Sequence, residues 1–140
     1  EINIRTKPGC YINITTCGEL MGGFWSRISR ETDGSKRTLL EQARMILVQQ
    51  LLAAILNHAA FGTPVPIDSV TGEDLITAGN MAYGDTNRTE MLRVAWLLDD
   101  FNNSGHDQPL PPPWEPPGPA TPQESRSLAD REFWDETCTD

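Results

Sequence analysis

The sequence is poor in positive charge, which argues against two classes of partner. Its 140 residues hold 11 Lys and Arg against 20 Asp and Glu, a net charge of −9. A surface of that sign repels nucleic-acid phosphates and anionic lipid headgroups. From His106 onward the sequence has eight Asp and Glu but only two Arg, so much of the negative charge lies toward the end of the chain. We therefore expect no nucleic-acid partner.

Long apolar runs are also missing. No uninterrupted apolar stretch approaches the roughly 18 residues that span a bilayer, so we expect no membrane insertion. The chain begins at Glu1 rather than at methionine, which favours removal of a secretion signal, with cleavage of a tag as the alternative. The prediction is an extracellular or cell-surface location.

Motifs for catalysis are absent. The sequence has no nucleophile elbow, phosphate loop, HExxH motif or CxxC motif, and its two histidines stand alone. Glu41, Asp99 and Asp100 could act as acids near a cleft, but the sequence shows no second catalytic residue to act with them. We therefore expect no enzymatic activity and no cofactor.

One partial cation-binding pattern is present. Asp100, Asn102 and Ser104 place oxygens at positions 1, 3 and 5 of a calcium loop, before Gly105. Pro111 stands where the loop requires a bidentate acid. These three residues are weak calcium candidates, and an Asx-rich helix exit is the favoured interpretation.

Three cysteines and three glycosylation sequons fit an exported protein. The disulfide candidates are Cys10, Cys17 and Cys138, and their odd number leaves one for an intermolecular bond or a free thiol. The sequons begin at Asn13, Asn87 and Asn102 and are candidates for covalent glycans in a glycosylating pathway. Each asparagine also has a structural interpretation: Asn13 as a strand residue, Asn87 as a helix cap and Asn102 as a helix terminator.

The pattern of apolar residues predicts a mainly α fold with a minor β element. Residues 2–16 alternate apolar and polar residues around Pro8-Gly9, as a hairpin does. Its exposed edges require a further strand, a helix or another molecule. Three core helices follow, over residues 39–61, from Thr71-x-x-Asp74 to about Met81, and from about 87 to 101. The small-residue stretch 17–25 allows close backbone approach or a bend at Gly22-Gly23.

A proline-rich segment separates this core from the end of the chain. Residues 109–122 hold eight of the eleven prolines and favour polyproline II, with a reach of roughly 40 Å. Thr121-Pro122-Gln123-Glu124 then starts an amphipathic helix that we expect to reach about Glu136. The predicted division is an N-terminal β arm (1–16), a helical core (17–108), a strap (109–122) and a C-terminal helix and tail (123–140).

Four features of the chain resemble a module of secreted bacterial and archaeal surface proteins. They are Cys17, Gly23-Phe24-Trp25, the sequence QQLLAAILN at 49–57, and LLDDFNNSGH at 97–106. The resemblance covers about residues 17–107 and implies export and a surface setting without implying a reaction. The module tends to place a cysteine after Gly-His, where this chain has Asp107. Cys17 then pairs with Cys10 or Cys138, or stays free.

These features favour an exported structural subunit that self-assembles into a filament or surface lattice, with copies of itself as partners. The candidate assembly contacts are Ile2, Ile4, Ile12, Ile14, Trp114, Phe133 and Trp134. Deleting residues 109–140 is then expected to abolish assembly and to leave the helical core folded. The alternative is a cell-surface module that binds sugar or protein through Trp25, Trp96, Trp114 or Trp134.

Overall fold

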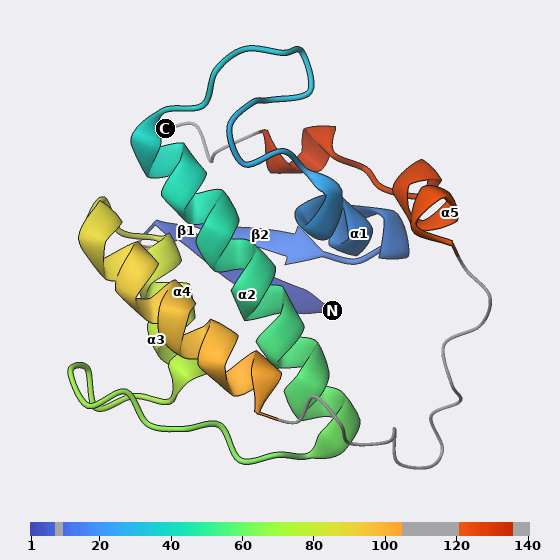
Figure 1. Ribbon diagram of the computed structural model, residues 1–140. Helices are drawn as coiled ribbons and strands as arrows, with labels where there is room; N and C mark the ends of the chain where they lie inside the picture. Colours follow the sequence, from blue (N-terminus) through green and yellow to red (C-terminus); the bar gives the residue numbers. More distant parts are fainter. Residues whose placement is uncertain (8–9, 105–120, 136–140) are drawn as a thin grey trace.

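The computed structural model describes residues 1–7, 10–104 and 121–135, and it confirms a mainly helical fold with a small N-terminal hairpin (Figure 1). In chain order the elements are β1 (Ile2–Lys7), β2 (Cys10–Ile14), α1 (Cys17–Trp25), α2 (Leu39–Phe61), α3 (Leu75–Tyr83), α4 (Arg88–Asn103), α5 (Pro122–Ser127) and the 3₁₀ turn η1 (Glu132–Trp134). Several sequence predictions fall outside the described residues: the Pro8-Gly9 turn, residues 109–120 of the strap with Trp114, Cys138, and the side chain of Cys10.

The long helix α2 is the centre of the fold, with α4 and α3 packed against it (Figure 1). Thr38 and Glu41 form the predicted capping box at its start, and Gly62 ends it in the left-handed conformation, with a φ of 64°. The predicted three-helix core is confirmed. Its fully enclosed apolar side chains include Leu47, Val48, Leu51 and Leu52 of α2, Ala78 of α3, and Met91, Val94 and Leu98 of α4.

By length and composition alone, α2 is apolar enough to cross a membrane. The central helix of a folded core passes the same test, and seven residues of α2 are buried inside the protein. α2 packs against α3 and α4.

An ion pair fixes the loop between α2 and α3. Asp68 is 2% exposed and accepts two hydrogen bonds from Arg93 of α4, at 2.9 and 2.7 Å. These bonds hold the pKa of the Asp68 carboxyl far below its usual range. Hydrogen bonds to Glu90 and Asp68 raise the pKa of Arg93. The loop is thereby tied to α4. Asp74, rather than the predicted Thr71, caps the start of α3, because the Thr71 hydroxyl bonds to Asp68 within this loop.

The hairpin packs its isoleucine face on the helices. β1 and β2 are antiparallel, with Ile2 opposite Ile14 and Ile4 opposite Ile12. Ile4 and Ile14 are buried, and the other two isoleucines pack partly against the core. α3 lies along β1, and the Arg5 N–H donates a 2.9 Å hydrogen bond to Asn80 Oδ1. The sequence predicted that the hairpin requires a further strand, a helix or another molecule beside it, and α3 of the same chain is that partner.

Residues 17–25 form a helix, α1, rather than the bend allowed by their two glycines. Thr16 and Glu19 make a capping box at its start, with the Glu19 carboxylate accepting the N–H groups of Thr15 and Thr16. Gly22 and Gly23 are buried on the face of α1 where other parts of the chain approach closely. The glycines therefore serve packing, and the capping box outweighs their low helix propensity.

The predicted C-terminal helix begins correctly and ends early. Thr121 and Glu124 form a capping box with Pro122 in the first turn, but α5 stops at Ser127, well before Glu136. The Asp130 N–H bonds instead to the Gly18 carbonyl of α1, at 2.8 Å. The prediction of one amphipathic helix is wrong because this long-range contact turns the chain. Residues 121–135, called here the C-terminal segment, lie beside α1 (Figure 1).

Candidate functional site

The C-terminal segment docks on α1 through Trp134. The indole is 3% exposed, and its Nε1 donates a 2.7 Å hydrogen bond to the Glu19 carbonyl of α1. Phe133 packs edge-on against it, with ring centroids 5.4 Å apart. A tryptophan buried with its N–H paired is the kind of anchor that holds one protein segment on another.

The two glycines of α1 form the socket for this anchor. A Cβ atom at Gly22 would lie 1.9 Å from the Asp130 carbonyl oxygen and 3.0 Å from the Trp134 ring. A Cβ atom at Gly23 would lie 3.1 Å from the same ring. No side chain fits at Gly22 while the segment is docked.

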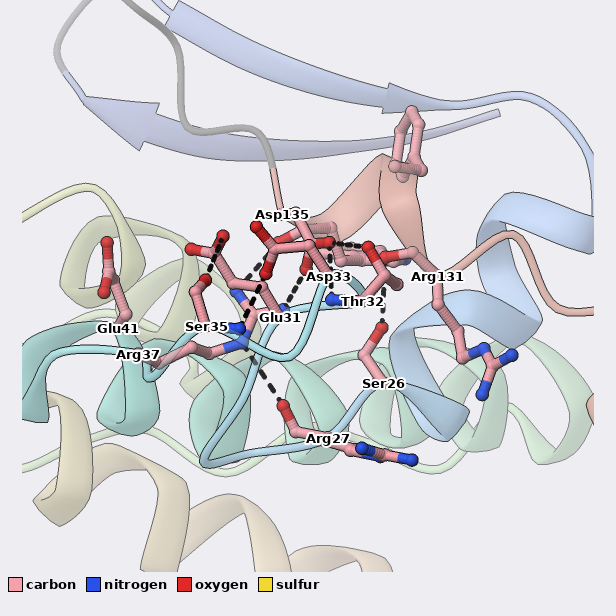
Figure 2. A network of polar contacts seen from close by, with 12 residues as sticks. Ser26, Arg27, Glu31, Thr32, Asp33, Ser35, Arg37, Glu41, Arg131 and Asp135 are labelled. Atoms are coloured by element: carbon pink, nitrogen blue, oxygen red, sulfur yellow. Dashed lines mark hydrogen bonds and ion pairs between the residues drawn. The ribbon is translucent and has the colours of Figure 1, made fainter.

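A buried arginine clasps the end of the segment to residues 26–38, the loop between α1 and α2. Arg37 is 4% exposed and donates to three acceptors: the Arg27 carbonyl at 3.2 Å, the Trp134 carbonyl at 3.4 Å, and Asp135 Oδ1 (Figure 2). The second oxygen of Asp135 accepts from the Thr32 N–H, at 2.9 Å, and from the Thr32 hydroxyl. We call this arrangement the Arg37 clasp.

The charges of the two docked parts are complementary. Residues 26–38 carry four basic and two acidic side chains, whereas residues 121–135 carry two basic and four acidic ones. Opposite net charges of +2 and −2 favour docking beyond the contacts of Trp134 alone.

A small polar pocket of about 130 Å³ lies across this joint. Its charged lining consists of Arg27, Arg30, Glu31 and Arg37 from the loop, and Arg131 and Asp135 from the C-terminal segment. With four arginines and two acids, its lining carries a net positive charge within an acidic chain. We call it the joint pocket.

The isoleucines and aromatics proposed as assembly contacts lie mostly inside their own chain. Ile4, Ile14 and Trp134 are buried, and Ile2, Ile12 and Phe133 pack partly against the core. A contact through these side chains with another copy therefore requires their present packing to open. Trp114 lies outside the described residues.

The calcium candidates do not gather into a ligand set. The Asn102 side-chain oxygen accepts from Asn57 at 3.1 Å, and its amide nitrogen donates to Gln50. The Ser104 hydroxyl bonds back to the Phe101 carbonyl at 2.7 Å. Within residues 1–7, 10–104 and 121–135, no group of three or more His, Cys, Asp and Glu could hold a metal ion. The interpretation of Asp100 and its neighbours as a helix exit fits these contacts.

The sequon asparagines differ in their environment. Asn13 is exposed on β2, and Asn87 is an exposed cap of α4 whose oxygen accepts from the Glu90 N–H. Both can carry a glycan without loss of a contact described here. Asn102 is half-buried, and its amide nitrogen already donates to Gln50, so a glycan there conflicts with the fold. Cys17 is exposed at the start of α1, and within the part of the chain that the structure describes it is a free thiol.

Of the tryptophans that the structure describes, Trp96 is the exposed one. It is 72% exposed on α4, beside a groove of about 210 Å³ lined also by Ile46, Gln50 and Asp99. Trp25 is half-buried under the Arg126 guanidinium, 4.4 Å from the ring centroid. Asp99 lines the groove, but no general acid or base partner is described beside it.

Sequence reasoning found the socket glycines but missed the Arg37 clasp. The Gly22-Gly23 pair indicated close backbone approach, which is what the segment makes. Arg37 and Asp135 gave no signal, because an ion pair between distant positions leaves no local pattern.

A comparison with protein-family models, curated proteins and solved structures finds no match. The resemblance to the surface-protein module stays a prediction.

Proposed function

We propose that this chain is an exported structural subunit that assembles with copies of itself by exchanging the C-terminal segment. In this proposal the Trp134 anchor of one copy fills the Gly22-Gly23 socket of the next. The observation that carries this proposal is that the C-terminal segment docks through a small set of contacts with one region of the protein. Its described polar contacts are the Trp134 indole hydrogen bond, the hydrogen bonds from the Asp130 N–H and the Ser26 hydroxyl, the Arg126 guanidinium over Trp25, and the Arg37 clasp, all made with α1 and residues 26–38.

The length of chain before the segment supports the exchange. Residues 105–120 separate α4 from the segment, and a proline-rich chain of sixteen residues reaches about 50 Å when extended. Exchange of an identical element needs no new contact surface, so it is a low-cost route to oligomers. When every copy donates one segment and accepts one, the contacts are head-to-tail and can continue without closing.

The N-terminal strands have a smaller part in this proposal than the sequence suggested. Their isoleucines are committed to the core, and the Arg5 N–H on β1 is capped by Asn80. β2 is the other edge of the two-stranded sheet, and Tyr11 and Asn13 are exposed along it. Any contribution of the hairpin to assembly therefore comes from the backbone edge of β2.

Two defective variants test the exchange. Gly22→Leu blocks the socket and leaves the segment intact, whereas a chain that ends at residue 120 lacks the segment and keeps the socket. Neither alone can continue a chain of exchanged subunits. Mixed one to one, they are expected to form a heterodimer, because one supplies the segment and the other supplies the socket.

The measurement is light scattering coupled to size-exclusion chromatography, with electron microscopy of the full-length protein beside it. Circular dichroism of each variant establishes that the helices are formed. Filaments of the full-length protein and a stoichiometric heterodimer support the exchange. Filaments that persist in the chain ending at residue 120 contradict it.

A surface-binding module is the second candidate function, and Trp96 is the observation that favours it. An exposed indole beside the Gln50 amide and the Asp99 carboxylate offers a stacking face and hydrogen-bonding groups together. This candidate expects a monomer whose tryptophan fluorescence changes with a sugar or peptide ligand. A monomer that responds in this way, and whose response is lost in Trp96→Ala, would favour it over self-assembly.

A further inference from the structure

We propose that the joint pocket binds a divalent oxyanion of the sulfate or phosphate type. The pocket holds a net charge of +2, from four arginines and two carboxylates, within a chain of net charge −9. Four like charges around one cavity repel each other, and an anion of charge −2 neutralises the excess.

The carboxylates of the pocket are already committed to other partners. Asp135 accepts from Arg37 and Thr32, and Glu31 accepts from the Ser35 hydroxyl at 3.1 Å. The three donating nitrogens of Arg37 all have acceptors, and Arg30 donates to the Gly34 carbonyl at 2.8 Å. Arg27 and Arg131 supply the remaining positive charge of the lining.

Arg27 and Arg131 line the joint pocket from its two sides. Both are exposed and line the same pocket, Arg27 from the loop after α1 and Arg131 from the C-terminal segment. In Figure 2 the Arg27 guanidinium lies below Ser26 and the Arg131 guanidinium to its right, and both extend away from Asp135. Guanidinium groups bind the oxygens of sulfate and phosphate in pairs of parallel hydrogen bonds, so two of them make a suitable cradle.

The size of the pocket sets the kind of ligand. A volume of about 130 Å³ accommodates one small anionic group and excludes a folded partner. The ligand is therefore a free inorganic ion or a single sulfate group of an acidic polysaccharide whose remainder stays in solvent. Both sources offer the same chemistry to Arg27 and Arg131.

Binding here strengthens the joint because the ligand bridges its two sides. An ion held by Arg27 and Arg131 links the loop to the C-terminal segment, in addition to the Arg37 clasp. A ligand that binds the docked state alone stabilises that state. The further consequence, that the anion controls exchange between copies, rests on the proposed function, whereas binding itself does not.

Calorimetric titration of the full-length protein with sodium sulfate, at constant ionic strength, tests the site. We expect saturable binding to one site, weakened at least about tenfold in Arg27→Ser and in Arg131→Ser, since each loses a charge-assisted pair of hydrogen bonds. Arg88→Ser is the matched control: it removes one exposed arginine at the start of α4, outside the pocket, and is expected to bind as the parent does. Circular dichroism and the thermal midpoint in chloride establish that each variant is folded.

Equal binding by Arg131→Ser and Arg88→Ser would overturn the proposal, and so would an absence of saturable heat in the parent. Titration with heparin, a sulfated polysaccharide, separates the two sources. Binding stronger than that of sulfate and still dependent on Arg131 points to the polymer, and equal or weaker binding points to the free ion. Light scattering of the same samples measures assembly independently of binding. A protein that binds sulfate but stays a monomer would refute the exchange between copies and would still support the anion site.

Discussion

Arg37 and Asp135 form an ion pair although they lie 98 positions apart in the sequence. Both side chains are largely withdrawn from solvent, at 3% and 15% exposure. The pair joins the loop before α2 to the end of the described chain. It makes the C-terminal segment part of the same folded body as the core, in place of the separate unit that the composition of the sequence suggested.

Breaking the Arg37 clasp is expected to destabilise the protein. Asp135→Asn leaves a buried guanidinium without its counter-charge, and we expect a loss of about 2 to 3 kcal/mol in the free energy of unfolding. Urea denaturation followed by circular dichroism measures it. Asp33→Asn, an exposed acid in the same loop outside the clasp, is the control and is expected to change stability by less than about 0.5 kcal/mol. Equal losses in the two variants would contradict a role for the clasp.

Replacing Trp134 with alanine is expected to cost much more stability than replacing Trp96 with alanine. Trp134→Ala empties the socket on α1 and removes the hydrogen bond to Glu19, so we expect a loss of about 3 kcal/mol or complete undocking of the segment. Trp96→Ala removes a side chain that is 72% exposed and is expected to cost less than about 1 kcal/mol. Urea denaturation gives both values, and limited proteolysis reports undocking. A Trp134 variant that is as stable and as resistant as the parent would count against the anchor.

Stability is expected to fall in acid through Asp68. Its folded-state pKa is lowered by the hydrogen bonds from Arg93, so the stabilising contribution is present above the unfolded pKa of about 3.9. It is lost as the pH falls through about 4 and below. Asp68→Asn is expected to cost about 2 to 3 kcal/mol at pH 7 and to flatten this part of the stability profile. Urea denaturation at a series of pH values checks the slope, and an unchanged slope in the variant would assign the acid sensitivity to other carboxyls.

Removing residues 121–140 is expected to loosen α1 while α2, α3 and α4 stay folded. The deletion uncovers the Gly22-Gly23 face and leaves Arg37 without Asp135, but it removes little from the central cluster around Leu47 and Leu98. Hydrogen exchange measured by mass spectrometry checks this peptide by peptide. Faster exchange confined to α1 and residues 26–38 is the expected result. Uniformly faster exchange would mean that the segment supports the whole core.

Local hydrogen bonding made several helix boundaries predictable from the sequence. Thr38 with Glu41, and Thr121 with Glu124, are capping boxes whose partners lie three residues apart, so the sequence contains the complete interaction. Asn87 caps α4 within the same span. The alternation of isoleucines likewise determined which face of the hairpin is apolar.

Tertiary contacts decided what these local patterns could not. α5 ends at Ser127 because the chain turns to place the Asp130 N–H on the Gly18 carbonyl. The glycines of α1 indicated close approach, but only the packed structure shows that Trp134 and Asp130 approach them. The joint pocket is assembled from arginines more than 90 positions apart, such as Arg37 and Arg131.

The sequence by itself determined the helical class of the protein, the starts of its main helices and its acidic character, because these follow from neighbours within one or two turns. Only the tertiary structure decided that the C-terminal segment docks on α1, that Arg37 pairs with Asp135, and that four arginines surround one pocket. The physical reason is that burial and ion pairing reward proximity in space, and chain folding brings together residues whose separation in sequence carries no pattern.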